Sequence, residues 1–267
     1  MQRQPEVADL SRNGERSSLT KKTALIDVQE AGASGDMFLS ALLDLMGEED
    51  ALLPVAAALL IYDPTLRVKV VQEERDGVNG KRLEVVGDKG IRLSPKSMVE
   101  VLQTVSEELE LSSTAAKLAE SALDEILQAE VRAHDTPLEE LHLHETGQVD
   151  TVLDIVGTIY LLEKMGLLNE VRFVSTRVAV GSGTIETEHG EMEVPVPAVA
   201  EILVAHDVPF LTGVAETEVL TPTGAALLVT LAQEDTDTSE GFIVSQQGTG
   251  FGSRDLGDAP NKMRISL

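Results

Sequence analysis

Two histidines and two aspartates fall within one short stretch, residues 141–157, which reads LHLHETGQVDTVLDIVG. His142 and His144 alternate with leucines, and on an extended chain side chains two positions apart point to the same side. Asp150 and Asp154 stand four residues apart in an apolar run, so a helix places them one turn apart on one side. A buried carboxylate costs free energy unless it is paired, hydrogen-bonded or bound to a cation. The four side chains therefore predict an N/O metal site suited to nickel or zinc.

The same side chains also allow structural roles. A His-x-His pair can be two partly buried histidines held by hydrogen bonds, and Asp150 can be the N-cap of its helix. His134, at the end of the preceding helical pattern, could join the two histidines and two aspartates in a metal site. A metal-dependent hydrolase is a third interpretation, which we rank last because no evident general base accompanies the cluster. The sequence leaves the choice between ligand and structural residue open.

A second candidate site is AGASGDM, residues 31–37, at a junction between a predicted strand and a predicted helix. Ser34 and Gly35 stand where free amide groups and the helix dipole can receive a phosphate. Asp36 would oppose a phosphate unless a cation lay between them. The alternative is a tight turn in which Ser34 caps the helix.

A third candidate is the glycine-rich segment QQGTGFGSRD, residues 246–255. Its glycines precede no predicted helix, so the segment fails the context test of a dinucleotide fingerprint. We interpret it as a flexible strap that ends in Arg254 and Asp255. The guanidinium of Arg254 can grip a phosphate bidentately.

The amino-acid composition limits the classes of binding partner and of metal ligand that this chain can have. Acidic residues outnumber basic ones 46 to 21 in 267 residues, and the formal net charge is -25. Such a chain repels polyphosphates and anionic headgroups, which argues against nucleic acid and membrane as partners. Because the chain has no cysteine, disulfides, thiolate ligands and cysteine nucleophiles are excluded. Any metal must be held by histidine, by carboxylate or by a bound ligand.

The first 22 residues are polar and lack the apolar segment of a secretory signal. No later apolar run is long enough to span a bilayer. We therefore expect a cytoplasmic protein with a flexible N-terminal tail, residues 1–22, followed by one region over residues 23–267.

Hydrophobic periodicity and turn residues predict an α+β fold in which mixed β-sheets pack with helices. The expected strands cover residues 23–28, 66–74, 81–87, 171–180, 184–194, 242–248 and 262–267, and residues 184–194 contain a turn near His189 and Gly190. The expected helices cover residues 36–46, 52–60, 113–134, 150–162 and 198–205, with two more opening at Ser94 and Thr221, the second running to 232. Two lobes with a boundary near residue 136 are one arrangement that this pattern allows.

Five fragments together carry a resemblance to a known family. SGDMFLSALLDLMG, LHLHETGQVDTVLDIVG, GSGTIETEHGEMEVPVPA, LTPTGAALL and GTGFGSRDLGDAPNKMRI resemble, in order and spacing, the N-terminal half of the LarC-type nickel-insertion proteins. Each fragment is weak alone, but five in this order are specific. The resemblance extends from residue 23 to the end of the chain.

The resemblance implies a chelatase that inserts nickel into pyridinium-3,5-bisthiocarboxylic acid mononucleotide with CTP hydrolysis, forming the pincer cofactor of lactate racemase-type enzymes. Nickel would be held by His142, His144, Asp150 and Asp154. The mononucleotide would be held by Ser34, Gly35, Asp36 and Arg254. Histidine and carboxylate ligands could deliver nickel to a substrate whose sulfurs are softer donors and bind it more tightly.

Two departures from the family limit what the resemblance implies. The family often has a histidine-rich insert, whereas the corresponding residues 87–98 contain no histidine. The family's C-terminal half, to which CTP binding with a divalent metal is ascribed, has no counterpart here. We therefore expect a C-terminal-half polypeptide as partner; the alternative is a non-catalytic module that binds nickel or the finished cofactor. A homo-oligomer stays open.

Overall fold

A mixed seven-stranded sheet forms the base of the molecule in the computed structural model, which describes residues 22–188, 190–236, 242–254, 256 and 260–267. Apart from Lys22, the expected tail lies outside these residues. The strands, in spatial order, are β2 (Arg67–Arg75), β3 (Val78–Val86), β10 (Gln247–Phe251), β11 (Lys262–Ser266), β1 (Lys22–Asp27), β4 (Val171–Thr176) and β9 (Ala232–Thr236).

Parallel and antiparallel pairs are combined in this sheet. β1 runs parallel to β4, β4 to β9 and β10 to β3, whereas β11 is antiparallel to both β1 and β10. The hairpin of β2 and β3 closes at Asp76 and Gly77, both with φ in the left-handed region, at 52° and 77°. Two-residue turns of this kind match the twist of the strands. The predicted α+β class with mixed sheets is confirmed.

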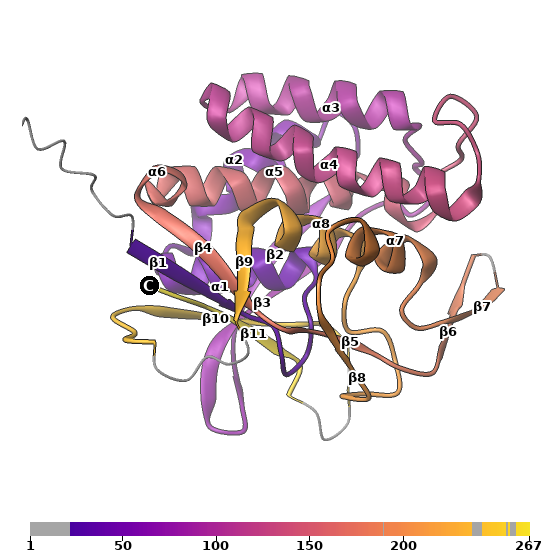
Figure 1. Ribbon diagram of the computed structural model, residues 1–267. Coiled ribbons are helices and arrows are strands. Elements are labelled where there is room, and N and C mark those ends of the chain that lie inside the picture. Colours follow the sequence, from indigo (N-terminus) through magenta and orange to yellow (C-terminus); the bar gives the residue numbers. More distant parts are fainter. Residues whose placement is uncertain (1–21, 189, 237–241, 255, 257–259) are drawn as a thin grey trace, which may run out of the picture.

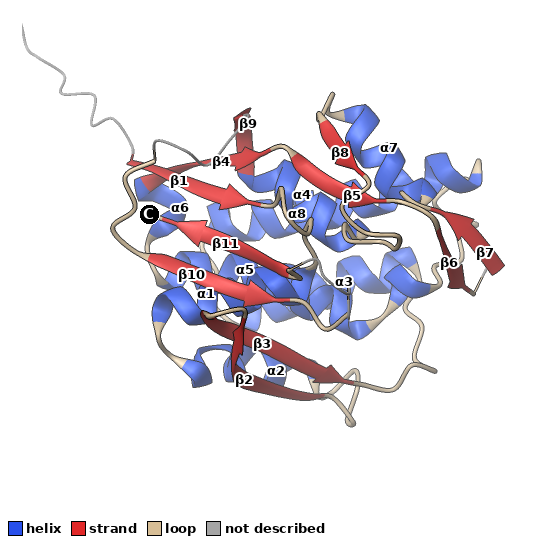
Figure 2. Cartoon of the chain, turned by 90° about the horizontal axis from the view of Figure 1, so that it is seen from below, coloured by secondary structure: helices blue, strands red, loops and turns tan. Residues whose placement is uncertain are grey.

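Helices gather on one side of the sheet, as Figure 2 shows from below. They are α1 (Gly35–Met46), α2 (Leu53–Leu59), α3 (Pro95–Glu108), α4 (Ser113–His134), α5 (Val149–Lys164), α6 (Leu167–Glu170), α7 (Pro197–Ala205) and α8 (Pro222–Leu231). α1 and α8 pack on the sheet, α5 packs on α1, α4 covers α5 and α8, and α3 lies along α4 in the outermost layer (Figure 1).

Most of the buried hydrophobic residues form one cluster, which includes residues from both sides of residue 136. α5 occupies its centre, and almost all of its apolar side chains are buried. The nearly uniform hydrophobicity of this helix therefore follows from contacts with helices all around it.

The glycine-rich segment is part of the sheet. We predicted a strand over residues 242–248 and a flexible strap over residues 246–255. The strand β10 instead begins at Gln247 and contains Gly248 and Gly250. A Cβ on Gly248 would lie 2.0 Å from the carbonyl oxygen of Ala41, and one on Gly250 would lie 2.1 Å from that of Met37. The glycines thus let the backbone of α1 pack directly on β10, a long-range contact that the local pattern does not reveal.

Two short sheets flank the large one. The predicted strand over residues 171–180 divides at Arg177 into β4 and β5 (Val178–Gly181), and β5 pairs with β8 (Phe210–Thr212), which the sequence did not predict. β6 (Thr184–Thr187) and β7 (Gly190–Glu193) form the second sheet, an antiparallel hairpin; His189, at its predicted turn, lies outside the described residues. Strands this short depend on a distant partner more than on their own pattern.

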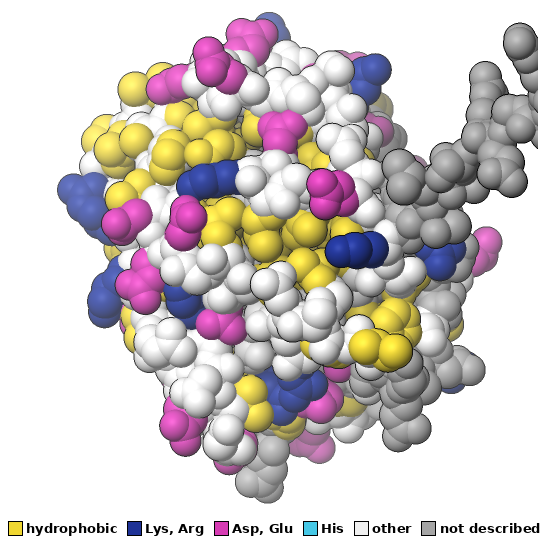
Figure 3. Space-filling model, turned by 90° about the vertical axis from the view of Figure 1, so that its left-hand side faces the viewer, with side chains coloured by type: hydrophobic (Ala, Val, Ile, Leu, Met, Phe, Trp, Pro, Cys, Tyr) yellow, Lys and Arg dark blue, Asp and Glu magenta, His cyan; other side chains and the backbone are white. Residues whose placement is uncertain are grey.

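The surface mixes charges of both signs with hydrophobic side chains, as Figure 3 shows for the face at the left of Figure 1. Exposed hydrophobic side chains are ordinary on the surface of globular proteins. None of the helices in the described part of the chain has the length and apolar character required to cross a membrane.

Candidate functional site

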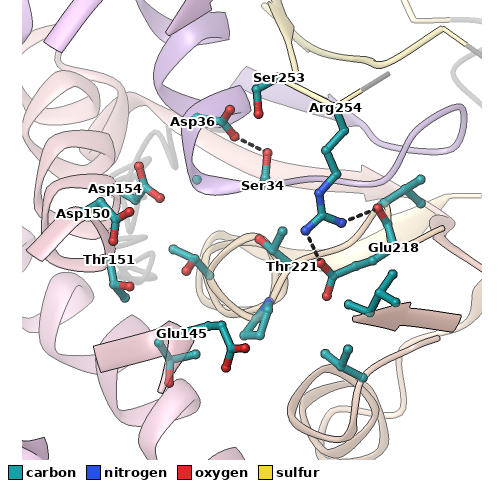
Figure 4. Close-up of a pocket in the computed structure, with 18 of the residues that line it drawn as sticks. Ser34, Asp36, Glu145, Asp150, Thr151, Asp154, Glu218, Thr221, Ser253 and Arg254 are labelled. Carbon is teal, nitrogen blue, oxygen red and sulfur yellow. Dashed lines mark hydrogen bonds and ion pairs between the residues drawn. The ribbon is translucent and has the colours of Figure 1, made fainter. Parts of the chain in front are cut away.

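A cavity of about 940 Å³ opens where several elements begin or end. The starts of α1, α5 and α8, the end of α4, the β6–β7 hairpin and the segment after β10 contribute to its wall. The ionisable side chains that line it include the acids Asp36, Glu145, Asp150, Asp154 and Glu218, the arginines Arg82 and Arg254, and the histidines His134 and His144. Figure 4 shows several of these side chains converging on one space.

The loop before α1 is fixed against the start of α8. The amide of Thr221 donates to the carbonyl oxygen of Ala33 at 3.0 Å, and a Cβ on Gly224 would lie 2.1 Å from the same oxygen. Thr221 also caps α8, because its Oγ1 accepts from the amide of Gly224 at 3.1 Å. The predicted start of a helix at Thr221 is thus confirmed, and the same contacts bring Thr221 to the cavity wall.

Ser34 occupies the N-cap position of α1, yet its side chain does not cap the helix. Its hydroxyl donates instead to Oδ1 of Asp36, so the capping alternative for Ser34 is wrong. Burial raises the pKa of Asp36, while the hydrogen bond from Ser34, the amide of Met37 and the charge of Arg254 oppose that rise. The start of α1 therefore presents a partly compensated carboxyl to the cavity.

α5 carries two acids into the same space. Asp150 and Asp154, one helical turn apart, both line the cavity, as their spacing predicted. The N-cap of α5 is Gln148, so the interpretation of Asp150 as the cap is wrong. Burial raises the pKa of Asp150, and its own amide and that of Thr151, with Lys89 and Arg92 farther away, oppose this.

Asp154 is the least compensated of these acids. Burial raises its pKa well above the ordinary 3.8, and the charges of Asp150 and Asp36 raise it further. A Cβ on Gly35 would lie only 2.1 Å from Oδ2 of Asp154, so glycine at the first position of α1 lets this carboxyl reach the helix start. The charges of Asp36 and Asp150 thus lie close enough to Asp154 to disfavour its ionisation.

The two predicted histidine ligands differ in position. Leu141 and Leu143 are buried at 6% exposure each, but the segment pairs with no strand and leads into a short 3-10 helix, Glu145–Gly147. His144 lines the cavity, where its Nδ1 lies 3.1 Å from Oε2 of Glu188. The cavity wall, in the part of the chain that the structure describes, does not include His142, whose Nδ1 lies 2.8 Å from the carbonyl oxygen of Glu140.

His134, the further candidate, lines the cavity at the end of α4. Its Nε2 lies 3.3 Å from Oε2 of Glu130, whose other oxygen accepts from the hydroxyl of Thr146 at 2.8 Å. Within the described ranges, no three His, Asp or Glu side chains are already grouped as ligands of one metal ion. The predicted set of nickel ligands stays a prediction.

Arg254 faces the start of α1 from the opposite wall (Figure 4). Its guanidinium donates to the backbone oxygen of Glu218 at 2.8 Å and contacts Oε2 of the same residue at 2.7 Å. Glu218 is 5% exposed, and burial raises its pKa although Arg254 opposes the rise. The structure thus brings Ser34, Asp36 and Arg254 to one cavity, as expected of a shared site.

Residues 24–267 match the protein family described as "Nickel insertion protein". This chain belongs to the nickel insertion protein family. A putative nickel insertion protein of Methanopyrus kandleri is 40% identical over 242 residues, 91% of this chain and 59% of the relative. A pyridinium-3,5-bisthiocarboxylic acid mononucleotide nickel insertion protein of Akkermansia muciniphila is 34% identical over 250 residues, 91% of this chain and 60% of the relative. One of the same name from Clostridium kluyveri is 31% identical, over 88% of this chain and 59% of its own length.

The chain thus spans about three-fifths of the length of these family members. No solved structure matches it.

Several acids of the cavity wall were not predicted from the sequence, among them Glu145 and Glu218. Glu145 directly follows the His-x-His pair, and this position next to candidate ligands is the signal that could have identified it. Glu218 lies in a segment without regular periodicity, which the bridges of Glu218 to Gly181 and of Leu220 to Ala33 hold at the cavity. No local signal in the sequence marks Glu218 as buried.

Proposed function

We propose that this chain inserts nickel into pyridinium-3,5-bisthiocarboxylic acid mononucleotide, the compound named in two of its relatives. The product would be the nickel-pincer cofactor of lactate racemase-type enzymes, made in the cytoplasm as the sequence predicts. Nickel is a substrate in this reaction. The observation that carries the proposal is the convergence of Asp36, Asp150 and Asp154 in a cavity that also contains Arg254.

The three acids supply the cation-binding side of the reaction. Their mutual repulsion and burial make the empty cavity unfavourable for three negative charges, and a divalent cation relieves both costs. We assign Asp150, Asp154 and His144 as nickel-binding residues, with Asp36 facing them. His142 is the least supported of the four predicted ligands, because it would have to reach the metal from outside the described cavity wall.

The substrate supplies the ligands that take the nickel over. Carboxylates are hard donors, and the two thiocarboxylate sulfurs of the mononucleotide are softer, so nickel passes toward the stronger ligand set. A protein site that bound nickel as tightly as a thiolate site would oppose this transfer. The absence of cysteine from the sequence is consistent with this role.

The phosphate of the mononucleotide would lie between Arg254 and the loop of Ser34 and Gly35. Asp36 disfavours a phosphate by itself, but nickel bound among the acids screens its charge. With nickel between the acids and the phosphate, the binding of either ligand favours the binding of the other. We assign CTP and its divalent metal to the part of the relatives that this chain does not align with, and expect a C-terminal-half polypeptide as partner.

The proposal is tested by equilibrium dialysis with metal analysis, with and without the mononucleotide. We expect near-stoichiometric nickel that binds more tightly when the mononucleotide is present, because its sulfurs complete the coordination. Tight nickel binding that does not change with the mononucleotide would indicate the alternative, a storage module. Binding of neither nickel nor mononucleotide would refute both.

A further inference from the structure

Glu218 is a buried acid held in place by its own backbone. It is 5% exposed, and its segment forms an isolated antiparallel bridge with Gly181. Gly181 has φ of 82°, and a Cβ there would lie 1.9 Å from the carbonyl oxygen of Thr217. Because the two backbones touch, the backbone of Glu218 has little freedom to move away from the cavity wall.

The backbone that carries Arg254 is also fixed. The side-chain amide of Asn261 donates to the carbonyl oxygen of Arg254 at 2.7 Å, and Arg75 donates to that of Gly252 at 3.0 Å. A Cβ on Gly252 would lie 2.4 Å from the side chain of Asn261, so this turn is tightly packed. The guanidinium therefore extends from a rigid base, and its side chain is 47% exposed.

Glu218 engages two sites on that guanidinium, one through its backbone oxygen and one through its carboxylate. A guanidinium has five N–H donors in a planar fork, so three of them are not used by these two contacts. Fixing two donors fixes the plane of the whole group. In Figure 4 the guanidinium of Arg254 lies across the cavity from Asp36, with the side chain of Ser34 between them.

We propose that Glu218 is a positioning residue that holds the guanidinium of Arg254 in the orientation that binds the phosphate of the mononucleotide. The inference rests on the proposed function. Glu218 keeps this contact when the phosphate binds, because its buried carboxylate would otherwise lose its cationic partner. Phosphate then uses the remaining N–H donors, and the pair acts as one preorganised unit.

The test compares the affinity of Glu218→Gln, Arg254→Ala and the double variant for two probes, the pyridinium mononucleotide and its nucleoside without phosphate. We expect Glu218→Gln to weaken mononucleotide binding about tenfold and Arg254→Ala about a hundredfold. In the Arg254→Ala background, Glu218→Gln should have no further effect. Neither change should alter the affinity for the nucleoside.

A matched control is Glu201→Gln, which removes the acid from another arginine pair, Arg132 to Glu201 at 3.0 Å, on the outside of the molecule. It should leave both affinities unchanged. If Glu218→Gln fails to fold, Arg254→Lys replaces it: a lysine keeps the charge but lacks the fork, and should weaken mononucleotide binding about tenfold without affecting the nucleoside.

The inference is overturned if Glu218→Gln tightens mononucleotide binding, which would make Glu218 a competitor of the phosphate. Equal effects of Glu218→Gln with and without Arg254 would also overturn it, as would equal losses for both probes. If the wild-type protein binds nickel but not the mononucleotide, the proposed function fails instead. The two failures are therefore distinguishable from the wild-type measurement alone.

Discussion

Each of the two walls of the cavity contains a buried acid, but the groups around that acid differ between the walls. On one wall, Asp154 lies beside two other acids, Asp36 and Asp150, whose charges raise its pKa. On the opposite wall, Glu218 is also buried and its pKa is also raised, but Arg254 lies 2.7 Å from its carboxylate. A buried acid is thus compensated by an arginine on one side, whereas on the other no cation is paired with Asp154 among the described residues.

We relate this difference to the two proposed roles. The paired acid orients an arginine, whereas the acids around Asp154 would bind a cation that offsets the cost of their burial. Proteins retain such unfavourable groups where function requires them. Removing the charge of Arg254 and removing that of Asp154 should therefore change stability in opposite directions.

The largest expected effect comes from Gly35, where the start of α1 directly contacts Asp154 of the acidic wall. Gly35→Ala would place a Cβ 2.1 Å from Oδ2 of Asp154, and we expect the free energy of unfolding to fall by about 3 kcal/mol. Urea denaturation measures this change. Gly90→Ala is the control, because the nearest atom to its added Cβ is 3.1 Å away on the side chain of Asp88, and it should change stability by less than about 0.5 kcal/mol. Equal effects of the two variants would show that the close approach is not needed.

Removing the arginine from the wall that contains Glu218 and Arg254 should also destabilise the protein. Arg254→Ala leaves the carboxylate of Glu218 buried without a partner, and we expect a loss of about 2 kcal/mol at pH 7, less than for a fully buried pair because Arg254 is half-exposed. The additional change Glu218→Gln should restore part of this loss. A double variant less stable than Arg254→Ala would contradict the comparison. The measurement is again the urea midpoint.

Neutralising the unpaired wall should stabilise the protein. A raised pKa means that the native state binds the proton of Asp154 more tightly than the unfolded chain, so stability falls as pH rises from about 3.8 through the raised pKa. Asp154→Asn removes this loss, and we expect it to be more stable than wild type by about 1 kcal/mol at pH 7 and equal to it near pH 3. The same variant should bind nickel at least about tenfold more weakly. Denaturation across this pH range decides the sign; a less stable variant at pH 7 would show that the acid is compensated.

The smallest effect on stability is expected for the two histidines, which nevertheless sharpen the ligand assignment. His144→Ala and His142→Ala are both at exposed or half-exposed positions, and each should change stability by less than about 0.5 kcal/mol. Nickel affinity by equilibrium dialysis should fall about tenfold for His144→Ala and stay unchanged for His142→Ala. A loss only for His142→Ala would place the nickel outside the cavity.

Much of the fold could be predicted because it depends on local patterns. The first strand and the helix after it, the β2–β3 hairpin and the long helix α4 all have periodicity and turn residues that act over a few neighbours. The predicted position of strand β10 was wrong because its glycines are typical of a loop. Their place in the sheet follows from the close packing of the α1 backbone on Gly248 and Gly250. β8 could not be foreseen, since its partner β5 lies some thirty residues away in the sequence.

For the site, the sequence by itself determined which chemistry is available. It placed acids one turn apart in an apolar helix, gave the start of α1 the order Ser34, Gly35, Asp36, and excluded every thiolate ligand. The tertiary structure alone decided which of these groups meet. It brought α1 against α5 through Gly35, paired Arg254 with Glu218, and left His142 out of the described cavity wall. The physical reason is that residue type and local spacing fix the donors and the face of an element, whereas convergence depends on packing between elements far apart in the chain.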